Sequence, residues 1–305
     1  MPYAIRRFVD RLGGKPHAIE HEILDTPAPT PSFGGPRVPA AGPDAGLVID
    51  RLTVRYGGVL AVEDVTVRAP IGVITGLIGP NGAGKTTAFN ACSGLLKPTA
   101  GRIVLHGTDV TRADPSHRAR RGLGRTFQRV QLFESLDVRT NVALARECGI
   151  AGRNPLRQVF SSRGDARTIQ AAVNEAIELV GIEPLVDAPV KDLSTGQRRL
   201  VELARVLAGS FDLLLLDEPS SGLDQSETEE FGAILQRVVA ERGVGILLVE
   251  HDMALVQQIC ERVHVLDFGR LLFEGSADEM VASEVVRAAY LGSEGVETAL
   301  DTIAP

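Results

Sequence analysis

A glycine-rich segment with a lysine has the clearest chemistry in this sequence. Residues 79–86 read Gly-Pro-Asn-Gly-Ala-Gly-Lys-Thr, which is the spacing of a phosphate-binding loop. Gly82 and Gly84 let the backbone approach a triphosphate, so that a row of N–H groups surrounds its oxygens. Lys85 is placed to neutralise the β- and γ-phosphates, and the Thr86 hydroxyl to hold Mg²⁺. The alternative is a glycine-rich turn with an incidental lysine.

The elements on either side of this loop have the patterns that the motif needs. Residues 72–78 form an apolar run, which predicts a strand buried on both faces. Residues 85–95 predict a helix, whose first N–H groups would favour an anion. We therefore expect nucleotide contacts along the whole loop, from Gly79, Pro80, Asn81, Gly82, Ala83, Gly84, Lys85, Thr86 and Thr87.

A second apolar segment ends in two adjacent carboxylates. The strand expected at residues 212–216 is followed by Asp217 and Glu218. We expect this strand to lie inside the sheet beside the strand that precedes the loop, and to deliver both acids at the phosphate edge. Asp217 would hold Mg²⁺, usually through water, and Glu218 would polarise the attacking water as a general base. The alternative is that the two acids only cap the next helix.

A segment ahead of the acidic strand identifies a family. Residues 193–197, Leu-Ser-Thr-Gly-Gln, are followed by two arginines and resemble the signature sequence of the ABC ATPases. Thr195 departs from the glycine that is more usual there, which would alter how tightly this loop closes on a γ-phosphate. The resemblance covers about residues 47–292 and includes the adenine-stacking aromatic, the glutamine loop, the loop after the acidic strand and the switch histidine, at Tyr56, Gln128, Ser220–Asp224 and His251.

This resemblance implies a reaction and a set of roles. Two such domains would face head to tail with two ATP molecules, and Mg²⁺, between them. The signature loop of one subunit would bind the γ-phosphate held by the other, through Ser194 and the N–H groups of Gly196 and Gln197. Asp224 would link the two sites. Catalysis would use Glu218, His251 and Gln128, and the metal would be held by Thr86, Gln128 and Asp217. Residue type alone leaves two alternatives open, since His251 could cap or pack and Tyr56 could pack.

The expected fold is α/β: a P-loop NTPase of the ABC type, with an antiparallel β subdomain, a mostly parallel core sheet and a helical subdomain. Strands and helices alternate after residue 212, which is the pattern of a parallel sheet. The helical subdomain is expected at about 115–207, with a solvated, arginine-containing loop before a helix at 168–180. The ATPase domain would occupy residues 47–292, after a disordered Pro/Gly-rich arm at 1–46 and before a tail at 293–305.

Composition narrows the functional class. A net charge of −7 argues against a nucleic-acid-binding surface. The three cysteines are widely spaced and form no metal pattern, so they are expected to be buried small hydrophobes in a reducing compartment. Neither a signal peptide nor an apolar run of about 18 residues is recognisable. Any membrane role would therefore depend on a partner.

Finer features resemble the ATPase subunits of branched-chain amino acid importers. These are residues 124–128, 132–138, 141–142, 249–253, 255–256, 267–271, 274–275 and 289–292. The resemblance implies a peripheral protein on the cytoplasmic face of the membrane, bound to permease subunits and paired with itself or with a sister ATPase. An external solute-binding protein would be an indirect partner. Related urea or amide importers share several features, so the solute stays open.

The surface that would grip a permease is expected around the glutamine loop. Val130, Leu132 and Phe133 are the candidate apolar anchors, and the alternative is that they pack the helical subdomain against the sheet. A soluble regulatory ABC ATPase is the rival function, although this chain has neither a second ABC unit nor a coiled-coil insertion. A module that only binds nucleotide is disfavoured because Glu218 and His251 are both present.

Overall fold

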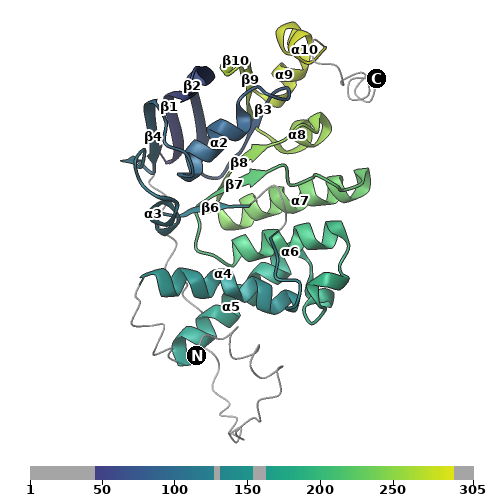
Figure 1. Cartoon of the computed structure of the whole chain (residues 1–305). Helices are drawn as coiled ribbons and strands as arrows, with labels where there is room; N and C mark the ends of the chain where they lie inside the picture. The colour runs from purple at the N-terminus through teal and green to yellow at the C-terminus, as the bar shows by residue number, and fades with distance from the viewer. Residues whose placement is uncertain (1–44, 127–130, 154–162, 292–305) are drawn as a thin grey trace, which may run out of the picture. The chain divides into compact units, whose positions relative to one another are not determined.

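The computed structural model describes residues 45–126, 131–153 and 163–291, which fall into two compact units (Figure 1). The helical unit contains residues 131–210. The sheet unit contains the remaining described residues, 45–126 and 211–291. The expected arm at 1–46 and tail at 293–305 lie almost entirely outside the described residues.

The sheet unit begins with an antiparallel sheet. Its strand order is β2-β1-β4-β5, with β1 at Gly46–Tyr56, β2 at Val59–Pro70, β4 at Ala100–Leu105 and β5 at Thr108–Asp109. Alternate residues of β1, such as Leu47 and Ile49, are buried, as expected for a sheet that covers a core with one face. The two strands turn at Gly57, which has a positive φ of 57°.

A six-stranded sheet forms the centre of the sheet unit. Its order is β10-β9-β3-β8-β7-β6, and β10 alone runs antiparallel to its neighbour. The three central strands are buried at every residue, which explains their continuous apolar sequences. The bounds are β3 Ile74–Ile78, β6 Leu123–Arg125, β7 Leu213–Asp217, β8 Gly245–Val249, β9 Arg262–Asp267 and β10 Arg270–Gly275. The expected combination of an antiparallel sheet, a mostly parallel sheet and helices is confirmed.

The order of the central strands corrects one expectation. The acidic strand β7 does not lie beside the P-loop strand β3, because β8 is inserted between them. Both β7 and β8 are short, apolar and fully buried, so their sequences do not distinguish which of them is the neighbour of β3.

Helix α2 (Lys85–Ser93) supplies much of the core of the sheet unit. It follows β3 and ends at Gly94, whose left-handed φ of 83° closes the helix. Its residues Phe89 and Cys92 are fully buried in one apolar cluster with residues of both sheets, and Figure 1 shows the helix between them. Burial raises the pKa of the Cys92 thiol to about 12, as it does for Cys260, in keeping with their expected role as buried hydrophobes.

Other helices complete the sheet unit. Helices α7 (Gln225–Arg242) and α8 (Met253–Ile259) pack against each other, and α8 covers β3 where Gly76 faces Cys260. The remaining helices are α3 (Pro115–Arg120), α9 (Ala277–Ala282) and α10 (Glu284–Leu291).

The helical unit contains three longer helices that contact one another. They are α4 (Val138–Arg153), α5 (Arg163–Val180) and α6 (Thr195–Leu207), with two short 3₁₀ turns at Glu183–Leu185 and Val190–Asp192. Apolar residues of α5, including Val173 and Ala176, are fully buried, in agreement with the helical spacing expected at 168–180.

The region expected to be mainly helical differs in two places. Strand β6 interrupts it and belongs to the core sheet, so the helical unit starts at residue 131 rather than near 115. The arginine-containing loop was expected to include Arg153, Arg157, Arg163 and Arg167, but α4 ends at Arg153 and α5 begins at Arg163, five residues before the expected Thr168. Arg153, Arg163 and Arg167 are therefore helical, and Arg157 lies outside the described residues. Within the described residues, no helix combines the length and the apolar character that spanning a bilayer requires.

Candidate nucleotide-binding site

The register of the core sheet brings the expected motifs to one edge. Leu77 of β3 pairs with Val249 of β8, and Val249 pairs with Asp217 of β7. Since all three strands are parallel, the residues that follow them meet at the same carboxyl edge. These residues are the phosphate-binding loop, Glu218 and His251.

The loop between β3 and α2 has the backbone that a phosphate site needs. Gly79, Gly82 and Gly84 have φ values of 147°, 83° and 98°. A Cβ on Gly84 would lie 2.6 Å from the carbonyl oxygen of Ala61, so only glycine fits this point. Gly84 is also the N-cap residue of α2. It has no side chain that could accept a hydrogen bond from the first N–H groups, and the first turn has no acidic residue. The first N–H groups of α2 are thus suited to an anionic ligand.

Lys85 is held at the base of this loop. Its ammonium group donates hydrogen bonds to the carbonyl oxygens of Gly79 at 2.5 Å and Pro80 at 2.9 Å. Burial lowers the pKa of Lys85, and the nearby carboxylates of Glu218 and Asp217 oppose that shift. Lys85 therefore lies near both acids of the second motif, and its donors would have to turn from the loop carbonyls to reach a phosphate.

Asp217 is buried at the end of β7 and has a cationic neighbour. Its carboxylate oxygen Oδ2 lies 3.3 Å from Nη2 of Arg125, the last residue of β6. The Asp217 backbone N–H donates to the Thr126 hydroxyl at 3.4 Å, and the Thr126 N–H donates to the Leu215 carbonyl at 2.9 Å. Strand β6 therefore connects Asp217 to the segment that leads into the expected glutamine loop.

Glu218 has an unusual backbone conformation. Its φ of +47° is left-handed, which is rare for a residue with a long side chain. Its N–H donates to the Val249 carbonyl at 2.9 Å, which holds the residue against the end of β8. Its carboxylate Oε1 lies 3.8 Å from Nδ1 of His251, whose side chain is 58% exposed. His251 therefore faces solvent and Glu218, and is not a core histidine.

The donors expected for Mg²⁺ suit that ion in kind. Mg²⁺ prefers oxygen ligands and is usually held by one or two carboxylates together with substrate phosphates and water. Thr86, at the start of α2, is exposed and offers a hydroxyl, and Asp217 offers a carboxylate. Among the described residues, no cluster of three or more His, Cys, Asp or Glu side chains could hold a metal by itself. Gln128, the third expected donor, lies outside the described residues.

Tyr56 lies at the end of β1 and is 51% exposed. A tyrosine that packed into the core would be largely buried, so its exposure argues against the packing alternative. The ring remains available to stack on a flat ligand.

The signature segment forms the start of α6 in the helical unit. Ser194 caps the helix, and its hydroxyl accepts a hydrogen bond from the Gln197 N–H at 3.2 Å. The Gln197 side chain accepts in return from the Ser194 N–H at 3.0 Å. Two groups expected to bind a γ-phosphate are thus paired with each other in the single chain. Asp224 has the same capping role at α7, where it accepts from the Glu227 N–H at 2.8 Å.

Two charged residues at this edge were not expected to have a role. Arg125 and Glu250 were recognised only as letters within longer motifs. Arg125 is a basic residue at the end of the short strand β6, and Glu250 is an acidic residue directly after the buried strand β8. A charged residue next to a buried strand was the signal in the sequence that could have indicated a role. The residue that each charge pairs with, however, depends on the order of the strands in the sheet.

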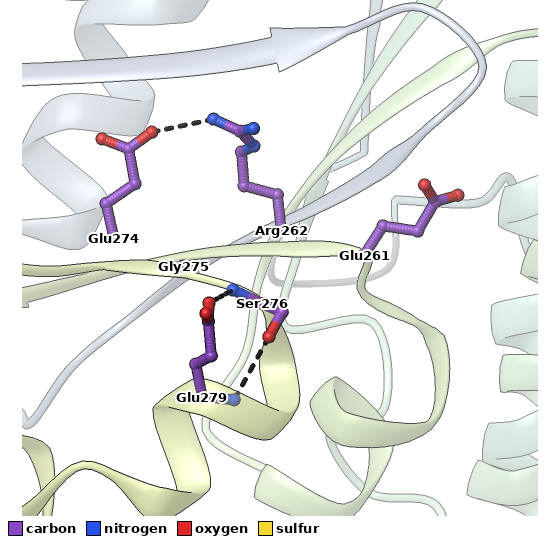
Figure 2. A pocket seen from close by; sticks show the side chains of 6 residues that line it. All are labelled: Glu261, Arg262, Glu274, Gly275, Ser276 and Glu279. Carbon is purple, nitrogen blue, oxygen red and sulfur yellow. Dashed lines mark hydrogen bonds and ion pairs between the residues drawn. The ribbon is translucent and has the colours of Figure 1, made fainter.

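A pocket of about 390 Å³ is lined by residues in or next to β9, β10 and α9 (Figure 2). Three of its charged groups, Arg262, Glu274 and Glu279, have partners among the lining residues. Glu274 is 2.9 Å from Arg262, and Glu279 accepts from the Ser276 N–H at 2.8 Å as part of the cap of α9. None of the lining residues belongs to the expected nucleotide site.

Comparisons with known proteins show the family of this chain. Residues 62–221 match the family model described as ABC transporter. The chain is 35% identical over 250 residues to the high-affinity branched-chain amino acid transport ATP-binding protein BraF of Pseudomonas aeruginosa, covering 81% of this chain and 97% of BraF. It is 34% identical to the lipopolysaccharide export system ATP-binding protein LptB of Escherichia coli, covering 82% and 98%.

The fold is also that of a solved cassette. The structure described as the ADP conformation of MJ1267, an ATP-binding cassette of an ABC transporter, superposes with a TM-score of 0.70 at 26% identity. The match covers 81% of this chain and 98% of the other. The chain therefore belongs to the ABC transporter family and is an ATPase subunit of a transporter.

Proposed function

We propose that this ATPase powers the import of branched-chain amino acids, or a related small polar solute, through separate permease subunits. The observation that carries the ATPase part is the shared carboxyl edge of β3, β8 and β7, which gathers Lys85, Asp217, Glu218 and His251. The similarity to BraF supports the solute class. The similarity to LptB gives the rival assignment, in which the transporter exports its substrate.

The reaction follows from these residues. A triphosphate on the loop would draw Lys85 away from the Gly79 and Pro80 carbonyls, since a phosphate is the stronger partner for an ammonium group. Glu218 would take a proton from the attacking water, and His251, 3.8 Å away, would contact the γ-phosphate. Mg²⁺, held by Thr86, Asp217 and Gln128, would neutralise charge on the β- and γ-phosphates.

The active unit is a dimer, with itself or with a sister ATPase. Ser194 and the N–H groups of Gly196 and Gln197 would bind the γ-phosphate held by the partner. The Ser194–Gln197 cap supports a two-state role, because its hydroxyl and N–H satisfy each other until a phosphate arrives. Asp224 would link the two sites. Neither site is then complete in one chain, and ATP would hold the subunits together until hydrolysis releases them.

Docking to a permease is assigned to the start of the helical unit. The Phe133 side chain is 56% exposed, whereas Asn141 in α4 is fully buried. The Asn141 side chain binds both the backbone N–H and the backbone carbonyl of Phe133. The Phe133 N–H donates to Asn141 at 2.8 Å, and the Asn141 amide donates to the Phe133 carbonyl at 3.0 Å. A fixed backbone that presents an apolar ring to solvent suits a partner helix. Leu132 is half-buried beside it, and Val130 lies outside the described residues.

These partners would place the chain on the cytoplasmic face of the membrane, with an external solute-binding protein as an indirect partner. The test is purification from native membranes in mild detergent, followed by mass spectrometry of the bound proteins. Recovery of multi-span permeases with a sister ATPase is expected for the wild type and reduced for Phe133→Asp. Recovery of soluble partners only would contradict the transport assignment and favour the regulatory alternative.

A further inference from the structure

Glu250 is a fully buried carboxylate that the reaction described above does not use. It directly follows β8, and its two oxygens accept hydrogen bonds from two different segments. Oε1 accepts from the Ser220 N–H at 2.9 Å, and Oε2 accepts from the His251 N–H at 3.2 Å. One side chain thus joins the loop after the acidic strand to the switch histidine.

The environment of this carboxylate is unfavourable for a charge. Burial raises the pKa of Glu250, and the N–H groups of Ser220 and His251 act in the opposite direction. A neutral side chain at the end of a fully buried strand would avoid that desolvation cost. The position of the carboxylate therefore calls for an explanation beyond stability.

The two segments joined by Glu250 carry the reacting groups. Ser220 lies two residues after Glu218, and the Ser221 N–H donates to the Glu218 carbonyl at 3.1 Å, so the intervening turn is tight. Glu218 itself has the left-handed φ of +47°. His251 faces the Glu218 carboxylate at 3.8 Å. Glu218, the turn at Ser220, Glu250 and His251 are thus linked in a closed ring of contacts, in which each group contacts the next and His251 faces Glu218 again.

We propose that Glu250 is a positioning residue that fixes the separation of Glu218 and His251, so that the general base and the γ-phosphate contact are set together. This rests on the roles assigned to those two residues in the proposed function. Glu250 touches neither Lys85 nor the phosphate-binding loop in any hydrogen bond described above. Its effect is therefore expected on the chemical step and not on ATP binding.

The variant Glu250→Gln keeps the shape but turns one end of the side chain into a donor that opposes a backbone N–H. Hydrogen bonds to a charged group contribute about 1.5–3 kcal/mol, which corresponds to roughly 10- to 150-fold in rate if the contact is needed in the transition state. The kcat of the purified full-length chain for ATP is expected to fall by about that factor. The KM for ATP and the affinity for a fluorescent ATP analogue are expected to stay within about two-fold.

Glu202→Gln is the matched control. Glu202 is also a buried carboxylate, at 2% exposure, but it lies in α6 and faces Arg199 at 3.3 Å. Both variants are expected to change the melting temperature. Only Glu250→Gln is expected to lower kcat at a temperature where each protein is fully folded. Glu250→Asp keeps the carboxyl group but is too short to reach both N–H groups, and gives the same readout if Glu250→Gln does not fold.

Coupling to His251 completes the test. If Glu250 acts through His251, adding Glu250→Gln to His251→Ala lowers kcat much less than it does in the wild-type background. An unchanged kcat in Glu250→Gln, a rise in KM that accounts for the loss, or full additivity with His251→Ala would overturn the proposal. All of these measurements use ATP turnover of the chain without permeases. If the import assignment fails, the effect of Glu250→Gln on ATP turnover can therefore still be interpreted.

Discussion

Arg125 and Asp217 form a buried ion pair at the edge of the core sheet, with Nη2 of the guanidinium 3.3 Å from Oδ2 of the carboxylate. Their side chains are 13% and 6% exposed. The guanidinium also lies 4.9 Å above the centre of the Phe89 ring and donates to the Ser93 hydroxyl. Arg125 thereby ties the acidic strand to α2, the helix that follows the phosphate-binding loop.

Replacing Arg125 should therefore lower the free energy of unfolding more than replacing a surface arginine does. Arg125→Met would leave the buried Asp217 carboxylate without this cation, so the free energy of unfolding is expected to fall by about 3 kcal/mol. The double variant with Asp217→Asn should recover part of that loss. Arg102 pairs with Asp50 at 2.7 Å on the surface, and Arg102→Met should change stability by less than about 1 kcal/mol. Urea unfolding of the four proteins compares them, and equal losses for both arginines would contradict the buried-pair account.

Glu218→Gln removes the proposed base and should slow ATP turnover on the order of 10²–10⁴-fold. ATP binding should persist, because Lys85 and the loop are unchanged. The variant is therefore expected to accumulate as an ATP-bound dimer, visible by size-exclusion chromatography with ATP present. Lys85→Ala serves as the contrast, since it should weaken ATP binding and show no such dimer. Unchanged turnover in Glu218→Gln would remove Glu218 from the role of base.

Phe133→Asp should uncouple ATP hydrolysis from transport. The ring is exposed, and its backbone is fixed by Asn141, so a charge there alters the surface without disturbing the core. ATP affinity is expected to match the wild type, while solute-stimulated ATPase activity of the reconstituted complex is lost. Leu95→Asp replaces another exposed apolar residue, at 57% exposure, and should keep that stimulation. Loss of nucleotide binding in Phe133→Asp would instead mark Phe133 as part of the fold.

His264 predicts a loss of stability in acid. The ring is fully buried in β9 and faces Glu274 at 3.5 Å, and neither ring nitrogen makes a hydrogen bond. Burial lowers its pKa to about 4, Glu274 opposes this shift and Arg262 adds to it. Between pH 6.5 and 4 the unfolded chain binds a proton that the folded chain does not, so stability falls as the pH falls.

The shift of the His264 pKa corresponds to about 3 kcal/mol of stability. His264→Leu should therefore lose less stability than the wild type between pH 7 and pH 4.5, when both are unfolded in urea. An identical loss in the two proteins would show that His264 does not contribute to the acid sensitivity.

Local signals in the sequence were sufficient for much of the fold. The helix expected at 85–95 does start at Lys85, directly after the glycines of the loop, but it ends at Ser93 because Gly94 adopts a left-handed φ of 83°. The fully buried strands β3 and β7 were recognisable from their uninterrupted apolar runs. Strand β6 was missed, because three residues are too few to show a period.

The features that could not be predicted from the sequence are contacts between residues far apart along the chain. The insertion of β8 between β3 and β7 depends on pairing between segments about 170 residues apart, and no local pattern encodes it. The partners of Arg125 and Glu250 follow from that order, so their roles could not be read in advance. The start of α5 at Arg163 was missed because its first residues are polar and include a glycine, which hides the helical period.

The most direct test of the import assignment is uptake of radiolabelled leucine by proteoliposomes that contain this chain with its co-purified permeases and ATP on the side of the ATPase. The external binding protein would be supplied on the opposite side. Uptake that requires ATP and disappears with Glu218→Gln is the expected result. ATP hydrolysis that proceeds without leucine uptake, and that no branched-chain or related small polar solute stimulates, would contradict the account.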